Sequence, residues 1–264
     1  MRWPSMRKRG PIRLGLAGFL ALLLSSSGSV AADDLAVAIR MRDTKQVSAL
    51  LKAGADPNRH MSYGSAIGLA AALGPPETVV VLLDAGADPQ TPGFGGLTPL
   101  HQAVLSGQAE ITRILLKRGA RVDALDNLGR TPLLILASGS IDNLDVVKIL
   151  LQAGADPNAV QHGDQTSVLE YVARHGRVAE AELLVTAGAR INARDSVFGM
   201  TPLHDALDCW DGAIGNHDMV RFLIAHGADV NARDLNGQTP MDYVRICTPN
   251  SAHMISILAE AGAR

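Results

Sequence analysis

The chain has 264 residues, of which 47% are hydrophobic but only 3% aromatic, and it carries 24 basic against 26 acidic side chains. This composition supplies a sizeable core made mostly of Ala, Leu, Ile and Val, and such small side chains favour closely packed helices over a thick sandwich of sheets. The near-balanced charge excludes the strongly basic class of nucleic-acid-binding proteins.

The N-terminal segment, residues 1–32, is arranged as a signal peptide for export. Its start at 1–13 (MRWPSMRKRGPIR) is basic, the run at 14–24 is apolar, and SSSGSVAA at 25–32 is small and polar, which is the order of a secretory signal. The apolar run is short for a bilayer span, which disfavours an uncleaved anchor. We expect cleavage after Ala31 or Ala32 and a periplasmic or secreted protein with no stable membrane anchor.

Cleavage would also change the charge of the chain. The signal holds five basic side chains and no acidic one, so 19 basic and 26 acidic residues remain, a balance of −7. Phosphate contacts need clustered Lys and Arg, and no such cluster follows residue 32. We therefore expect no nucleic-acid partner.

Two short phrases recur along the rest of the chain. The first, Gly-Ala, comes directly after a Leu-rich run each time, with its glycines at Gly54, Gly86, Gly119, Gly154, Gly188, Gly227 and Gly262. The second precedes most of these runs and reads TPLH at 98–101, TPLL at 131–134, TSVL at 166–169, TPLH at 201–204 and TPMD at 239–242, with a divergent copy, SAIG, from Ser65. The chain is therefore built from repeats.

The third copy, GLTPLHQAVLSGQAEITRILLKRGA, predicts a pair of helices. Thr98 is placed to cap the first helix, and Pro99 fits the first turn, where its missing N–H costs nothing. Gly107 ends that helix, and residues 109–117 form a second one with an apolar stripe at helical spacing. Gly119 is expected to end the second helix in the left-handed conformation that glycine adopts at low cost.

Together the two phrases and their spacing resemble the ankyrin repeat, whose period is about 33 residues and whose signature is T-P-L-H-x-A. The resemblance covers residues 34–264 and implies an all-α fold: an ankyrin-repeat solenoid of about seven helix-turn-helix units with hairpin fingers, preceded by the signal peptide. Because no unit buries its apolar stripe alone, the units of the domain at 33–264 must stack. The expected units span about 34–62, 63–95, 96–128, 129–163, 164–198, 199–236 and 237–264.

The sequence contains no recognisable catalytic or cofactor-binding motif. GFGG at 93–96 lacks the lysine of a phosphate loop, there is no G-x-S-x-G, and the histidines follow no metal-binding spacing. His101 and His204 belong to TPLH, and the resemblance implies that this histidine braces the turn region by hydrogen bonds. We expect no enzyme, no catalytic residue, no cofactor and no metal.

The two cysteines occupy equivalent positions, each eight residues after the threonine of its unit. Because exported proteins oxidise their cysteines, we expect a disulfide between Cys209 and Cys247. His217 and His253 lie in the same two loops, so a Cys2His2 zinc set is an alternative. A metal- or redox-handling protein that uses this region is accordingly the alternative function.

The resemblance implies a non-catalytic protein–protein interaction module that binds its partner with the concave surface of fingers and first helices, here in the cell envelope. One version is an inhibitor or immunity-type protein, and its acidic finger and helix residues, among them Asp205 and Asp208 with exposed side chains, would suit a basic target. Phe94 and Phe198 are expected aromatic anchors at finger tips. The expected contact residues are Phe94, Leu97, Gln102, Asn127, Leu128, Arg130, His162, Gln165, Glu170, Phe198, Met200, Asp205, Asp208, Leu235, Asn236, Gln238 and Tyr243.

Overall fold

The computed structural model describes residues 34–61, 64–139, 143–207, 216–247 and 252–264. The chain divides into two compact units, Met1–Ala32 and Asp33–Arg264, and the described residues belong to the second. The predicted signal peptide lies outside them. No helix among the described residues combines the length and the apolar character that a membrane crossing requires.

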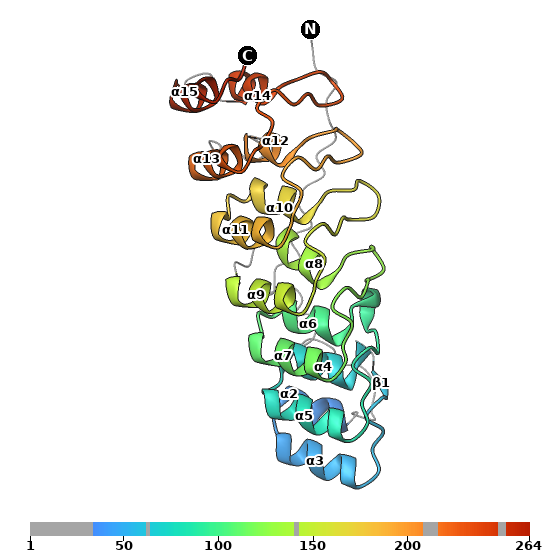
Figure 1. The fold of residues 1–264 in the computed structure, drawn as a ribbon. Coiled ribbons are helices and arrows are strands. Elements are labelled where there is room, and N and C mark those ends of the chain that lie inside the picture. The colour runs from blue at the N-terminus through green and yellow to red at the C-terminus, as the bar shows by residue number, and fades with distance from the viewer. Residues whose placement is uncertain (1–33, 62–63, 140–142, 208–215, 248–251) are drawn as a thin grey trace. The chain divides into compact units, whose positions relative to one another are not determined.

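The second unit consists of paired antiparallel helices, stacked in chain order (Figure 1). The predicted all-α ankyrin-repeat solenoid is confirmed. The pairs are α2 (Asp34–Arg40) with α3 (Thr44–Lys52), α4 (Ala66–Leu73) with α5 (Pro76–Asp84), α6 (Pro99–Leu105) with α7 (Ala109–Lys117), α8 (Pro132–Ser138) with α9 (Leu144–Gln152), α10 (Val168–Arg174) with α11 (Val178–Thr186), α12 (Pro202–Leu207) with α13 (His217–Ala225), and α14 (Pro240–Cys247) with α15 (Ala252–Glu260).

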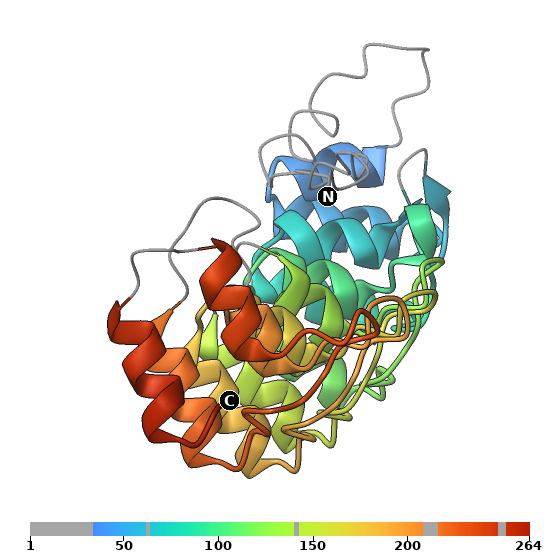
Figure 2. The same ribbon diagram turned by 90° about the horizontal axis from the view of Figure 1, so that it is seen from above.

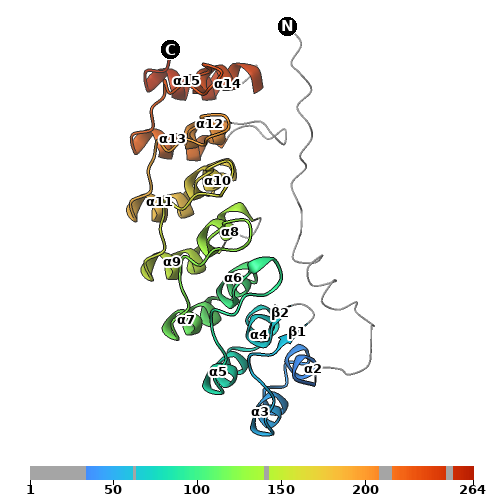
Figure 3. The same cartoon turned by 90° about the vertical axis from the view of Figure 1, so that its right-hand side faces the viewer.

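The loops that join one pair to the next project to one side as fingers, which run roughly parallel when seen along the stack (Figure 2). Short regular structure occurs in two of them. Strand β1 (His60–Met61) pairs antiparallel with β2 (Gly64–Ser65), and a 3-10 turn, η1, spans Phe94–Gly96. The first helix of each pair and the second form two rows, and the row of first helices lies on the inner side of the curve (Figure 3).

From α4 onward, each first helix begins directly after a Ser or Thr of the TPLH-type phrase. The Oγ1 of Thr98 accepts from the backbone N–H of His101, and that of Thr131 accepts from Leu134. Proline follows at the first helical position in both cases, as predicted. These local contacts fix the start of the helix without help from neighbouring units.

The fifth copy begins one residue later than predicted. Its N-cap is Ser167 rather than Thr166, and the helix starts at Val168, so the phrase is SVLE at 167–170. Ser167 is the N-cap because it forms a reciprocal capping box with Glu170, in which each side chain accepts a hydrogen bond from the other residue's backbone N–H. The extra residue falls in the finger, where Gln165 adopts a positive φ of 59°.

The second helices end as the Gly-Ala phrase predicts. All seven of its glycines have φ between 88° and 97°, a region that costs other residues free energy because of their Cβ atom. At Gly119 this turn lets the N–H of Ala120 reach back to the carbonyl of Leu115. The chain then leaves the helix toward the next finger.

A single apolar core runs through the stack from Leu35 to Leu258. In the third pair it takes Leu100 from α6 and Ile111 and Leu115 from α7, all fully buried. Since each pair covers the apolar stripe of the next, removing one pair would expose its two neighbours.

Polar side chains link the units along the turns below the fingers. The amide of Asn158 donates to the carbonyl of Gly188 and accepts from the N–H of Arg190 in the next unit. Asn58, Asn192 and Asn231 make the same pair of bonds. This ladder fixes the spacing of the unit starts, and therefore of the fingers.

Candidate protein-binding surface

The fingers that precede α6, α8, α10, α12 and α14 are called fingers 3 to 7 after the unit they lead into (residues 87–97, 120–130, 155–166, 189–200 and 228–238). Fingers 4, 6 and 7 are each held by one buried aspartate. Asp195 accepts from the backbone N–H groups of Val197, Phe198 and Met200. Asp126 and Asp234 each accept from two such groups in their own finger. These acids shape the turn rather than face a partner.

Backbone hydrogen bonds also join consecutive finger tips. The N–H of Asn127 donates to the carbonyl of Gly95 at 2.9 Å, and that of Leu235 donates to Phe198 at 2.7 Å. Ser196 donates in the same way to Asp164. Finger 3 is therefore joined to finger 4, and fingers 5, 6 and 7 are joined to one another, which lowers the entropy lost when a partner binds.

Glycine permits this close approach between fingers. Gly129 has φ of 70°, and a Cβ there would overlap with the His162 ring of the next finger. At Gly199 a Cβ would lie 3.0 Å from Leu235 Cγ. The tip glycines are thus required both for the turn and for finger packing.

Most of the predicted contact residues do lie on these fingers. Four are large apolar side chains that stand out from the tips, namely Phe94 (75% exposed), Leu128 (59%), Phe198 (39%) and Leu235 (71%). The exposed polar ones are Asn127, His162, Gln165 and Asn236, and the half-buried ones are Arg130, Gln238 and Tyr243. Asp208 lies outside the described residues.

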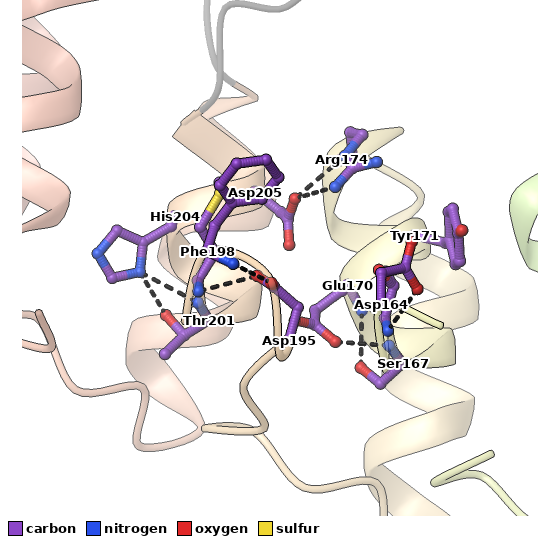
Figure 4. Close-up of polar contacts among 12 residues, drawn as sticks. Asp164, Ser167, Glu170, Tyr171, Arg174, Asp195, Phe198, Thr201, His204 and Asp205 are labelled. Atoms are coloured by element: carbon purple, nitrogen blue, oxygen red, sulfur yellow. Dashed lines mark hydrogen bonds and ion pairs between the residues drawn. The ribbon is translucent and has the colours of Figure 1, made fainter. Parts of the chain in front are cut away.

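Five predicted contact residues are buried, which corrects their assignment to the surface: Leu97, Gln102, Glu170, Met200 and Asp205. Leu97 and Met200 lie at the base of their fingers, just before the helix cap. Asp205 was expected to be exposed, but Arg174 of the preceding unit reaches across to it with Nε and Nη2 (Figure 4). Burial of these side chains depends on the neighbouring unit, which a single repeat does not reveal.

The structure adds surface residues that the sequence reasoning missed. Leu125 and Val197 are exposed apolar side chains on fingers 4 and 6. Arg194 and Arg233 stand directly before the buried aspartates of fingers 6 and 7 and are exposed. The sequence signal that would find them is their place beside that aspartate, in the turn that faces away from the core.

His101 and His204 brace the fingers as the resemblance implied. The Nδ1 of His101 accepts from the backbone N–H of Thr98, and Nε2 donates to the carbonyl of Arg130 in the next finger at 3.0 Å. His204 repeats these contacts with Thr201 and Gln238. Burial lowers the pKa of both histidines, which keeps them neutral and fits this donor and acceptor pattern.

Glu170 occupies the same helix position in the fifth unit and is fully buried. Its Oε2 accepts from the N–H of Ser167 at 2.5 Å, while Oε1 has no hydrogen-bond partner among the described residues. Burial raises the pKa of this carboxyl, and the negative charge of Asp195 adds to the effect, while the bonds from Ser167 and the charge of Arg174 oppose it (Figure 4). An ionised carboxylate has no proton to donate across to the next finger as the histidines do.

Glu170→Gln is therefore expected to stabilise the protein at neutral pH by about 1–2 kcal/mol, because it removes a buried charge with an unpaired oxygen. The pKa of Glu170 is higher in the folded than in the unfolded state. The ionised carboxyl therefore lowers the free energy of unfolding, and this loss grows as pH rises from the pKa of the unfolded state through that of the folded state. Below about pH 4 both forms are neutral and the gain should vanish.

Urea unfolding at pH 7 and at low pH measures this difference. Glu182→Gln, on the exposed face of α11, is the matched control and should change little at either pH. A Glu170→Gln protein that is less stable than the wild type at pH 7 would show that the bond from Ser167 outweighs the burial of the charge.

The proposed zinc and disulfide residues are only partly described. The rings of His217 on α13 and His253 on α15 lie side by side with centroids 5.1 Å apart, and the guanidinium of Arg221 lies 3.2 Å from His253 Nε2. Cys209 lies outside the described residues, and Cys247 is the last residue of α14. Among the described side chains, no group of three His, Cys, Asp or Glu is arranged to hold a metal.

Known proteins resemble the chain over most of this unit. A family model for ankyrin repeats matches residues 67–161, 142–234 and 169–264. Cyclin-dependent kinase 4 inhibitor B of Bos taurus is 33% identical over 137 residues, which cover 52% of this chain and 98% of that protein. NF-kappa-B inhibitor alpha of Gallus gallus is 37% identical over 146 residues, which cover 54% of this chain and 44% of that protein.

A solved structure agrees in three dimensions. The crystal structure of the ankyrin repeat domain of Bcl-3, a member of the IkappaB protein family, superposes with a TM-score of 0.74 at 26% identity, over 86% of this chain and 97% of that one. The chain spans only 14% to 44% of the length of six curated relatives. The period, the helix pairs and the family match agree, and the chain belongs to the ankyrin-repeat family.

Proposed function

We propose that the chain binds a protein partner through the tips of fingers 3 to 7 and the adjoining inner helices, and that it does so without catalysis. Ankyrin repeats are protein–protein interaction modules, and relatives of this chain are inhibitors by name. The observation that carries the proposal is the set of exposed apolar side chains on fingers 3 and 4, which are joined by a backbone bond, and on fingers 6 and 7, which are joined in the same way. Large apolar side chains held on a pre-formed surface are the usual centres of binding energy.

The double variant Phe94→Ala plus Phe198→Ala is expected to weaken partner binding about ten-fold or more, because anchor side chains at an interface typically cost about 2 kcal/mol when truncated. Partners captured by crosslinking from an envelope fraction would be identified by mass spectrometry, and their Kd measured with purified proteins. Met41→Ala, equally exposed but in the first unit, is the control. Equal capture by wild type and double variant would count against the fingers as the binding surface.

We further propose that the chain acts in the cell envelope after removal of residues 1–32. The basic, apolar and small-polar order of that segment supports export. N-terminal sequencing of protein from the periplasm or the medium should begin at Ala32 or Asp33. A chain that keeps Met1 and stays in the cytoplasm would exclude this location.

Export also underlies the proposed disulfide between Cys209 and Cys247, since oxidising compartments favour such bonds. Thiol titration of the exported protein under denaturing conditions decides it. Reactive thiols at both cysteines would exclude the bond and bring back the metal- or redox-handling alternative.

If the chain is an inhibitor, its partner is an enzyme, and a separate experiment tests this. If the fingers cover the active site of an enzyme, the wild-type chain should lower that enzyme's activity, and the Phe94→Ala plus Phe198→Ala variant should not. A captured partner whose activity is unchanged at saturation would leave protein binding in place and remove inhibition.

A further inference from the structure

The charges of fingers 6 and 7 are unevenly exposed. Residues 33–264 are acidic overall, with 26 acids against 19 bases. Asp195 and Asp234, the acids near these tips, are nevertheless buried. Their carboxylates accept hydrogen bonds from backbone N–H groups of their own turns. The exposed acid of these two fingers is Asp229, at the start of finger 7, which accepts from the N–H of Asn231 and is outnumbered by the exposed Arg190, Arg194 and Arg233.

Two arginines remain exposed beside those aspartates. The Nη1 of Arg194 donates to the carbonyls of Gly199 and Arg233, and the Nη1 of Arg233 donates to Gly237 at 2.7 Å. These acceptors are neutral, so they hold the guanidinium groups at the tips without cancelling their charge. Neither arginine forms an ion pair among the described residues.

Arg174 on α10, the inner helix of the preceding fifth unit, adds a third guanidinium group. It is paired with Asp205, whose side chain is 1% exposed, but its own side chain is 39% exposed. Its guanidinium carbon also lies 5.7 Å from the centre of the Tyr171 ring. Tyr171 and Arg174 are the residue types that most often dominate binding energy.

The acids that face this region are also engaged. Asp164 on finger 5 accepts from the N–H of Thr166. Asp242 on α14 accepts from Thr239 and lies 3.8 Å from Arg245, which is itself exposed. The net exposed charge around fingers 6 and 7 is therefore positive, although the unit as a whole is negative.

Exposed apolar side chains lie on the same two fingers as Arg194 and Arg233. Leu235 donates its N–H to Phe198, and its side chain lies close over Gly199. Val197 is also exposed on the same finger. A surface with both apolar side chains and guanidinium groups suits a protein partner, because a protein offers apolar side chains for the first and carboxylates for the second. A nucleic acid offers mainly phosphates, which would use only the guanidinium groups.

We propose that fingers 6 and 7, together with Arg174, dock a protein segment in which carboxylates alternate with apolar side chains. This inference rests on the proposed protein-binding function and specifies the chemistry of the partner. It differs from the basic target that the sequence suggested, because Asp205, one of the acids behind that expectation, is buried and paired with Arg174. Arginine binds a carboxylate in a two-pronged geometry, and the acidic remainder of the unit repels the same segment and so restricts it to this site.

A displayed library of random short peptides, selected on the full chain, tests the proposal. Selected peptides are expected to combine Asp or Glu with Phe, Leu or Ile, and to bind more weakly as salt is raised. Arg194→Gln plus Arg233→Gln removes both charges but keeps side-chain donors for the finger carbonyls. It should weaken the selected peptide about ten-fold in fluorescence anisotropy.

Arg113→Gln plus Lys148→Gln, on exposed faces of α7 and α9, is the matched control and should leave peptide binding unchanged. Circular dichroism and the Tm of both double variants establish that they are folded. A Leu235→Ser variant tests the apolar half of the site independently, and it should weaken the same peptide.

Selection of basic or uncharged peptides, or acidic peptides that bind the Arg194→Gln plus Arg233→Gln variant equally well, would overturn the proposal. So would failure to select any peptide. In each case a partner captured from the envelope and lost on Phe94→Ala plus Phe198→Ala would leave the proposed function standing. Binding of a labelled single-stranded oligonucleotide, lost in the arginine variant, would also overturn it and assign the surface to nucleic acid.

Discussion

Leu134→Ala is expected to lower the free energy of unfolding by about 2–5 kcal/mol, the range for truncating a fully buried leucine. Leu134 lies on α8 in the middle of the stack and has no exposed surface. The cavity would face the units on both sides, because each unit is stable only through its neighbours. Urea unfolding followed by circular dichroism measures the loss.

Leu128→Ala provides the control for this prediction. Leu128 belongs to the same unit but is exposed at the finger tip, so its truncation should change stability by no more than about 0.5 kcal/mol. Equal losses for the two variants would mean that the core does not run through the fourth unit as described. A split transition in Leu134→Ala alone would show that the two ends of the stack unfold separately.

Asp195→Ala is expected to cost about 2–4 kcal/mol, because three backbone N–H groups of finger 6 lose a charged acceptor. Those groups belong to Val197, Phe198 and Met200. Hydrogen exchange at these three amides should accelerate more than at the helix amides of α12. Peptide or partner binding should weaken as well, since the finger would no longer present Phe198 in a fixed position.

A double-mutant cycle sharpens this test. Removing Asp195 also removes a negative charge that raises the pKa of Glu170. The benefit of Glu170→Gln should therefore be smaller in the Asp195→Ala background than in the wild type. Asp145→Ala in the first turn of α9 is the control, and it should cost only about 0.3–1 kcal/mol through its helix dipole contact. Strict additivity of Glu170→Gln and Asp195→Ala would contradict the electrostatic interaction between Asp195 and Glu170.

Sequence reasoning predicted the repeat and its helices because their signals are local. The cap at Thr98, the helix at 109–117 and the turn at Gly119 were all predicted from single phrases, and the structure has each at the expected residue. Caps, helical periodicity and left-handed glycines act within a few residues of chain, so one copy contains all the information needed. Seven copies then determine the stack.

The fifth unit marks the limit of that reasoning. Thr166 and Ser167 are both good caps by sequence, and the choice of Ser167 depends on Glu170, three residues later. Glu170 in turn is fully buried, and Asp195 on finger 6 of the next unit lies close enough to raise its pKa. The local sequence around a residue does not predict which side chains of the adjacent unit will pack against it.

By itself, then, the sequence determined the family, the number of units and the position of nearly every helix cap and stop. Only the tertiary structure decided which polar side chains of the fingers and inner helices stay exposed. Asp195 and Asp205 are buried while Arg194 stays exposed, and this leaves finger 6 with exposed positive charge. The physical reason is that burial and pairing are set by the neighbouring unit, a whole repeat away along the chain, whereas helix propensity and capping are set within one turn.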